Sequence, residues 1–233
     1  IFTSPKIVTP QRSSQNTFTY ISNDWYAAQD VYYILNSKNE KQSLKILLLI
    51  LNSRLAYFWL NWMGKKKGKQ LELFGEPVSY FPVPFDLDQF ILVSILTDYI
   101  LFLNSIKNKD QLVKKIKEFL EKEITDSLIF ELYFKKRFYE DKLYPSNKFI
   151  LRDSVFENLV PIEYDQWAQL NYNENIGNGL NQQEEKMKLN MTEEFLRIIT
   201  ECYNSLNNKQ HIHEHIAKIN SHPWVRRIVV VND

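Results

Sequence analysis

The chain has 233 residues, of which 44% are hydrophobic and 24% charged, and its net charge is +1. This composition argues against intrinsic disorder and allows one elaborate domain or two small ones. The single cysteine, Cys202, excludes an internal disulfide, so we expect a buried thiol and a reducing, cytoplasmic location. The first residues, "IFTSPKIVTPQ", lack the apolar core of a signal peptide and an initiator methionine, so we expect a piece of a longer polypeptide.

Charge is distributed unevenly along the sequence. Residues 1–85 contain ten Lys or Arg and five Asp or Glu, giving +5, whereas residues 86–233 carry −4. A near-neutral total argues against a general nucleic-acid binder, but a basic first part is compatible with a local contact to phosphates.

The first forty residues predict three short strands. "KIVTP" ends at Pro10, "TFTYIS" places Phe18 and Tyr20 on one face, and "DVYYILN" alternates in the same way. They precede one long apolar segment, so the sequence predicts a small sheet packed against a helix.

That apolar segment, "SLKILLLILNSRLAYFWLNWMGKKKGK", predicts a core helix that Ser43 caps and Gly64 ends. A membrane span is disfavoured, because Asn52, Ser53 and Arg54 interrupt its centre and an arginine there costs about 3 kcal/mol. We expect a helix surrounded by other elements, followed by a mobile basic loop over residues 65–70. The expected core positions are Leu47, Ile50, Leu51, Leu55, Phe58 and Trp62.

A proline-rich stretch, "LELFGEPVSYFPVPF", predicts extended chain, because Pro77, Pro82 and Pro84 disfavour a helix and a central strand. Amphipathic helical patterns follow it, with a polar loop expected over residues 171–190. The predicted fold is α+β: a small mixed or antiparallel sheet on a long core helix, then a helical subdomain. The predicted domains are residues 1–86 and 87–233.

Motifs for catalysis are missing from the sequence. It contains no GxGxxG, no GxxxxGK[ST] and no Asn-Pro-Pro-aromatic tetrapeptide of an amino-methyltransferase. "HIHEH" could hold zinc, because His211 and His215 share a helix face, with Glu214 and His222 nearby, but a solvated helix surface is the simpler interpretation. We therefore predict no metal ligand and no cofactor.

A nuclease interpretation uses Asp165 with the triplet that contains Glu184 and Lys186, which could chelate Mg²⁺ and activate water. Such spacings also arise by chance in chains rich in Glu and Lys, and this triplet falls in the expected loop. The interpretation stays open as a third alternative, and we predict no catalytic residue.

The loop in "PQRSSQNTF" carries only hydrogen-bonding side chains between two strands. An arginine suits guanine O6 and N7, and Gln or Asn suits adenine N6 and N7, although a polar hairpin tip would have the same composition. A second loop supplies ammonium groups of the kind that bind phosphates. The predicted base-reading residues are Gln11, Arg12, Gln15 and Asn16, and the predicted phosphate-binding residues are Lys65, Lys66, Lys67 and Lys69.

The order of "PKIVTPQRSSQNTFTYISNDWYAAQDVYYIL", the apolar segment and "YFPVPF" resembles the TaqI-like C-terminal specificity domain of fused restriction-modification enzymes. "ITDSLIFELYF" resembles a helix that often follows, so the resemblance extends over roughly residues 5–135. It implies a target recognition domain for double-stranded DNA, with methyltransferase and endonuclease domains upstream in the same polypeptide.

We therefore predict a DNA sequence-recognition module without chemistry of its own and without contact to a membrane. The alternative is a non-catalytic protein-interaction module, in which aromatic residues pack on a partner and the lysines only solvate. Salt-sensitive binding to duplex DNA would distinguish the first from the second, and metal-dependent nicking would favour the nuclease.

Overall fold

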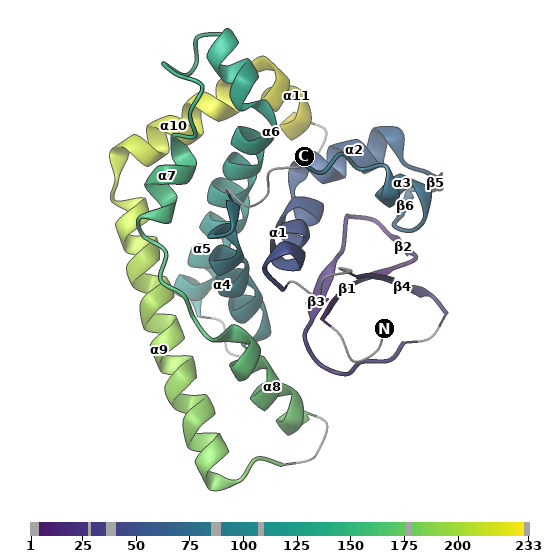
Figure 1. Ribbon diagram of the computed structural model, residues 1–233, viewed down its shortest axis with the longest axis vertical. Helices are drawn as coiled ribbons and strands as arrows, with labels where there is room; N and C mark the ends of the chain where they lie inside the picture. The colour runs from purple at the N-terminus through teal and green to yellow at the C-terminus, as the bar shows by residue number, and fades with distance from the viewer. Residues whose placement is uncertain are drawn as a thin grey trace.

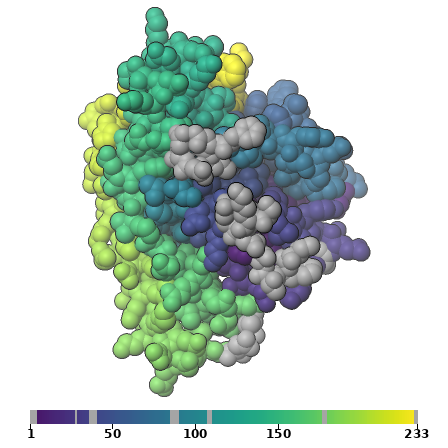
Figure 2. Space-filling model, viewed as in Figure 1, coloured from purple at the N-terminus to yellow at the C-terminus, as the bar shows by residue number. Residues whose placement is uncertain are grey.

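The computed structural model describes residues 5–27, 29–35, 41–84, 90–106, 110–175 and 179–230. Two small sheets lie beside the helices α1 and α2, and a larger group of helices covers the other side of these two helices (Figure 1). In the space-filling view the N-terminal residues sit directly against the helical residues (Figure 2). The predicted α+β class with a helical C-terminal region is confirmed.

The first sheet has three antiparallel strands, with β1 (Lys6–Pro10) between β3 (Thr19–Ile21) and β4 (Val31–Ile34). Ile7 pairs with Tyr20 on one side and with Ile34 on the other. Phe18 and Tyr20 are both buried and Thr19 is exposed, as the alternating pattern predicted. The sheet therefore presents one apolar face to the helices.

The second sheet is built from β2 (Arg12–Ser13), β5 (Lys66–Lys67) and β6 (Gln70–Glu72), all antiparallel, in the order β2, β6, β5. A single helical turn, α3 (Glu76–Ser79), follows it. The extended structure predicted at Pro77 is wrong, because this proline lies in the first turn of α3, where its missing N–H leaves no helical hydrogen bond unmade.

The predicted single core helix is wrong: it consists of α1 (Lys41–Asn52) and α2 (Arg54–Met63), bent by 65°. Ser53 has extended backbone angles, φ −73° and ψ 161°, and its side chain accepts a hydrogen bond from the Ala56 N–H, so it caps α2. Ser43 lies inside α1 and does not cap it. Trp62, predicted to be in the core, is 67% exposed at the end of α2.

Among the described residues, no single helix is long and apolar enough to cross a membrane. Only α1 and α2 taken together reach that length and composition, and they are separated by the bend.

The helical side begins with α4, a buried helix that packs along α1 (Figure 1). The polar loop predicted over residues 171–190 is wrong, because residues 171–175 end α8 and a capping box of Asn181 and Glu184 starts α9. The helices of this side are α4 (Val93–Ser105), α5 (Gln111–Glu118), the π-helix η2 (Phe119–Thr125), α6 (Asp126–Glu140), α7 (Leu151–Phe156), α8 (Tyr164–Asn175), α9 (Gln182–Asn207), α10 (Gln210–Ser221) and α11 (Pro223–Val230).

One continuous hydrophobic core extends through both sides of the molecule. It includes Ile7 and Ile50 from the N-terminal part and Leu96, Phe102 and Ile199 from the helical part, all of them fully buried. The predicted domain boundary, between residues 86 and 87, lies outside the described residues. The two predicted domains thus share a core wherever the structure describes them.

A buried carboxylate organises the start of α7. Glu131 on α6 accepts hydrogen bonds from the backbone N–H groups of Ile150, Leu151 and Arg152, at 2.7 to 2.8 Å, and from the Tyr144 hydroxyl at 2.7 Å. Burial raises its pKa, and these donors act in the opposite direction. The side chain therefore substitutes for a local cap on a short helix.

A second buried charged group joins α1 to α4 and α8. The Lys45 ammonium lies 2.6 Å from Asp98 Oδ1 and 3.4 Å from Asp165 Oδ1, and Lys41 Nζ lies 3.0 Å from Asp165 Oδ2. Desolvation raises the pKa of Asp98 from 3.8 to about 7, although the charge of Lys45 opposes this shift. Asp98 thus holds its proton far more tightly in the folded protein than in the unfolded chain.

This shift predicts a dependence of stability on pH. The contribution of Asp98 to the free energy of unfolding is complete below pH 3.8 and is lost as the pH rises towards about 7. Its slope is at most about 1.4 kcal/mol per pH unit. In urea denaturation across this range, Asp98→Asn should lack this fall, whereas the exposed control Asp30→Asn should keep it. Parallel profiles for wild type and Asp98→Asn would contradict the prediction.

Candidate nucleic-acid interface

The β2, β6, β5 sheet brings together the two loops that the sequence predicted separately. Arg12 pairs with Glu72 in the β2–β6 ladder, and Lys66 pairs with Leu71 in the β5–β6 ladder. Strand β6 therefore lies between the predicted base-reading and phosphate-binding residues. We call the residues 65–72 the basic hairpin.

The basic loop predicted over residues 65–70 is a β-hairpin closed by a two-residue turn. Lys67 pairs with Gln70, so Gly68 and Lys69 form a two-residue turn. Gly68 has a φ of 65° and Lys69 has no positive φ, which is the type II′ geometry with glycine first. This turn matches the twist of the two strands and holds the lysines on a defined edge.

Antiparallel pairing decides which side chains share a face of this sheet. Directly paired residues point to the same side, and neighbours along a strand point to opposite sides. Arg12, Glu72, Gln70 and Lys67 therefore form one face. Leu71, which is buried, faces the other way and anchors the hairpin to the core.

Arg12 is the cation that β2 contributes to this face. Its Nε lies 3.6 Å from Glu72 Oε1, and its side chain is 31% exposed. At this distance the pair is an electrostatic contact without a hydrogen bond, and Nε is a buried donor that no acceptor satisfies. Glu72 thus restrains the guanidinium while leaving donor capacity unused.

The lysines of the basic hairpin are all exposed. Lys65 forms an ion pair with Glu76 Oε2 at 3.1 Å, with both side chains about two thirds exposed. Lys66, Lys67 and Lys69 have no carboxylate partner among the described residues. The edge of the sheet therefore carries positive charge that the rest of the protein does not neutralise.

The other predicted base-reading residues have different surroundings. Gln15 is exposed, and its amide has no hydrogen-bond partner in the described part of the chain. Gln11 uses its backbone to bind Asp30 and Leu73. The Asn16 amide nitrogen, however, donates to the carbonyl oxygens of Leu51 at 2.6 Å and Ser53 at 3.0 Å. Asn16 is therefore engaged in the fold.

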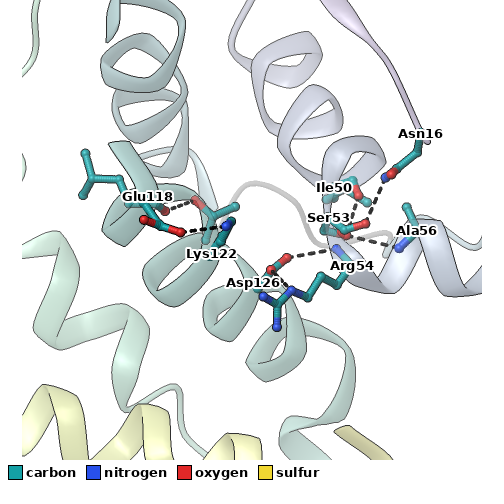
Figure 3. Close-up of polar contacts among 10 residues, drawn as sticks. Asn16, Ile50, Ser53, Arg54, Ala56, Glu118, Lys122 and Asp126 are labelled. Carbon is teal, nitrogen blue, oxygen red and sulfur yellow. Dashed lines mark hydrogen bonds and ion pairs between the residues drawn. The ribbon is translucent and has the colours of Figure 1, made fainter. Parts of the chain in front are cut away.

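Figure 3 shows Asn16 reaching the break between α1 and α2, where Asp126 approaches from the helical side. Asp126 accepts the Arg54 N–H at 2.9 Å and lies 3.2 Å from the Arg54 Nε. Burial raises the pKa of Asp126 to about 6, against the opposing influence of Arg54. The loop that contains Asn16 and the helical side therefore bind neighbouring backbone groups at the same helix break.

A groove of about 840 Å³ extends from Gln15 and Asn16 past this break to α4 and η2. Its charged lining residues are Arg54 and Lys122 together with Glu121 and Asp126, so it carries no net charge. Each cation has a carboxylate partner, Asp126 for Arg54 and Glu118 for Lys122. The groove therefore lacks the positive potential that a phosphate backbone requires.

The alternative metal sites are not assembled. His211 and His215 lie on α10 with ring centroids 6.5 Å apart, while His222 is buried and bonds Asp141 at 3.0 Å. Asp165 pairs with Lys41 and Lys45, and Glu184 completes the cap of α9. In the part of the chain that the structure describes, no three His, Cys, Asp or Glu side chains are grouped to hold a metal ion. Burial raises the pKa of Cys202 to about 12, as for an inert thiol.

Four strands, a helix pair and a closing hairpin follow one another in the N-terminal part of the chain, and a family model matches this part. Residues 1–83 match the TaqI-like C-terminal specificity domain. This match confirms the resemblance, over a shorter range than the residues 5–135 that the motifs suggested. The comparisons with curated proteins and with solved structures gave no match.

The TaqI-like segment, residues 1–83, contains both sheets, α1, α2 and α3. Every predicted base-reading and phosphate-binding residue lies within it. The stretch "ITDSLIFELYF" lies outside it and covers the end of η2 and the first part of α6.

Sequence reasoning missed two features of this interface. Glu72 was not singled out as the partner of Arg12, because the two residues are sixty positions apart. The hairpin turn could have been predicted from the sequence. The dipeptide "GK" at residues 68–69 places glycine first between two short runs, and this order is typical of a two-residue hairpin turn.

The neighbouring residues Gln15 and Asn16 have different roles: Asn16 stabilises the helix break, and the exposed Gln15 is available to contact a base. Asn16→Ala should lower the free energy of unfolding by about 1 to 2 kcal/mol, because two carbonyl groups lose their donor. Gln15→Ala, the control, should change it by less than about 0.5 kcal/mol. Chemical denaturation measures both, and equal effects would contradict the assignment of Asn16 to the helix break.

Proposed function

We propose that this chain recognises double-stranded DNA through the β2, β6, β5 sheet. The observation that carries the proposal is the placement of Arg12 and Lys67 on the same face of the sheet, with β6 between their strands. Lys66 lies on the same edge strand as Lys67 and points to the other face, and Lys69 lies in the adjoining turn. The match of residues 1–83 to a specificity domain supports the same conclusion.

A two-stranded β-ribbon fits the major groove of B-DNA, which is about 12 Å wide. The basic hairpin is such a ribbon, and its unpaired lysines suit the phosphates that border the groove. Arg12, restrained by Glu72, is then positioned to donate to the O6 and N7 of a guanine, and the free amide of Gln15 suits an adenine. Phosphate contacts would supply affinity, and Arg12 with Gln15 would supply selectivity.

The proposal assigns recognition, and no reaction, to this chain. Methyl transfer and cleavage would then be the work of other domains of a longer restriction-modification polypeptide, upstream of residue 1. Specificity domains serve such enzymes, and this supports the assignment.

A protein-interaction function has one specific observation in its favour. An apolar groove of about 360 Å³ lies between α2, α6 and α11 and is lined by Phe58, Trp59, Phe81, Tyr133 and Trp224, among others. Apolar grooves lined by aromatic residues are typical of binding sites. It lies on a different set of elements from the basic hairpin, so the two functions can be tested separately.

Changing all four hairpin lysines to alanine should weaken binding to cognate and random duplexes alike. Each lost phosphate contact removes about 0.9 from the slope of log K against log salt concentration, so the slope should flatten by roughly 2 to 3. Fluorescence anisotropy at several salt concentrations measures this slope. The matched control changes four lysines elsewhere, Lys114, Lys115, Lys136 and Lys186, and should leave the slope nearly unchanged. Identical slopes for both variants would reject the hairpin as the DNA surface.

Arg12→Ala should relax selectivity at one base position and leave the others intact. The expected loss of discrimination is about 1 to 3 kcal/mol, because one bidentate contact disappears. Selection from a randomised duplex library, followed by sequencing, measures it for wild type and variant. Uniform weakening at every position would show that Arg12 contacts a phosphate instead.

A further inference from the structure

The end of α2 exposes two large apolar side chains directly before the basic hairpin. Trp62 is 67% exposed and Met63 is 66% exposed, and Tyr80, after the adjacent α3, is 71% exposed. Apolar groups gathered on a surface in this way mark an interaction site. Neither Trp62 nor Met63 is needed to fill the core.

Gly64 fixes these side chains beside the lysines. A Cβ on Gly64 would lie 2.3 Å from the Leu60 carbonyl oxygen, so only glycine allows the chain to leave the helix at this point. The hairpin begins one residue later, where the Lys65 carbonyl accepts the Glu72 N–H at 2.9 Å. Two exposed apolar residues and the first lysine are therefore held within one turn of chain.

Trp62 also contacts another aromatic ring on α2. Its ring lies 6.1 Å from that of Phe58, one turn earlier on α2. The ion pair of Lys65 with Glu76 connects the start of the hairpin to α3. The tryptophan thus projects from the end of α2 with one side of its ring next to Phe58 and the rest exposed.

The neighbouring charges identify the partner of this surface. Tryptophan and methionine are enriched in protein interfaces, but lysine is depleted from them, and Lys66, Lys67 and Lys69 have no partner among the described residues. Proteins that deform DNA combine apolar wedges with cations that hold the flanking phosphates. Charge complementarity therefore favours a duplex over a protein surface here.

We propose that Trp62 and Met63 form an apolar wedge that presses into a groove of duplex DNA while the hairpin lysines hold the adjacent phosphates. The inference rests on the proposed function and adds a contact that is not ionic. It predicts that the bound duplex is locally unstacked where the wedge enters.

The first test measures binding of the full chain to a short duplex of random sequence. Trp62→Ala with Met63→Ala should weaken binding by about tenfold and leave the salt slope unchanged, because no phosphate contact is lost. The matched control, Met187→Ala with Leu189→Ala, removes two exposed apolar side chains from α9 and should bind as wild type does. Unchanged affinity of the Trp62 and Met63 variant would overturn the wedge.

The second test reports unstacking directly. Duplexes that carry 2-aminopurine at successive positions should brighten at one step when wild type or the α9 control binds, and stay dark with the Trp62 and Met63 variant at saturating protein. Equal brightening by all three proteins would overturn the wedge, as would none. If the hairpin lysine variant keeps the wild-type salt slope, the proposed function itself fails, and this outcome is distinct from failure of the wedge alone.

Discussion

The break between α1 and α2 is the constraint on which the rest of this structure depends. A helix that ends inside a core leaves backbone groups without intrahelical partners, and each must find one elsewhere. Here Ser53 caps α2, Asn16 binds the carbonyl groups of Leu51 and Ser53, and Asp126 accepts the Arg54 N–H. The Ser53 bond is local, whereas those of Asn16 and Asp126 come from distant parts of the sequence, so the break joins three segments of the chain.

The bend of 65° sets the direction of α2, whose end leads directly into the basic hairpin. On the helical side α2 packs against α6 and α11. Strand β6 completes a sheet with β2, and the residues of two remote loops form one surface. The candidate interface thus begins directly after the helix that follows the break.

Neutralisation of charge distinguishes this surface from the interior. The buried Lys45 is matched by Asp98 and Asp165, because an unpaired buried charge is costly. The buried Asp126 is likewise matched by the partly exposed Arg54. The exposed lysines of the hairpin need no such partner, since water solvates them, and so they remain available to an anionic ligand. The basic side chains of the first 85 residues, whose net charge is +5, therefore lie partly in ion pairs within the fold and partly exposed on the hairpin.

The sequence by itself determined the local elements and the chemical types of the interface. Alternation predicted the faces of β3, the glycines marked the ends of the lysine run, and the order of motifs indicated the specificity domain over what became residues 1–83. The sequence could not show the bend between α1 and α2. The apolar run predicts one continuous helix, whereas Ser53 can also cap a new helix, and the contacts of Asn16 and Asp126 at this point are long-range. Nor could it distinguish Gln15 from Asn16, which have similar amides and differ only in what lies within reach. Pairing of Arg12 with Glu72 and burial of Leu71 are long-range contacts, and only the tertiary structure decided them, because hydrogen-bond partners and solvent exposure are set by elements far apart in the chain.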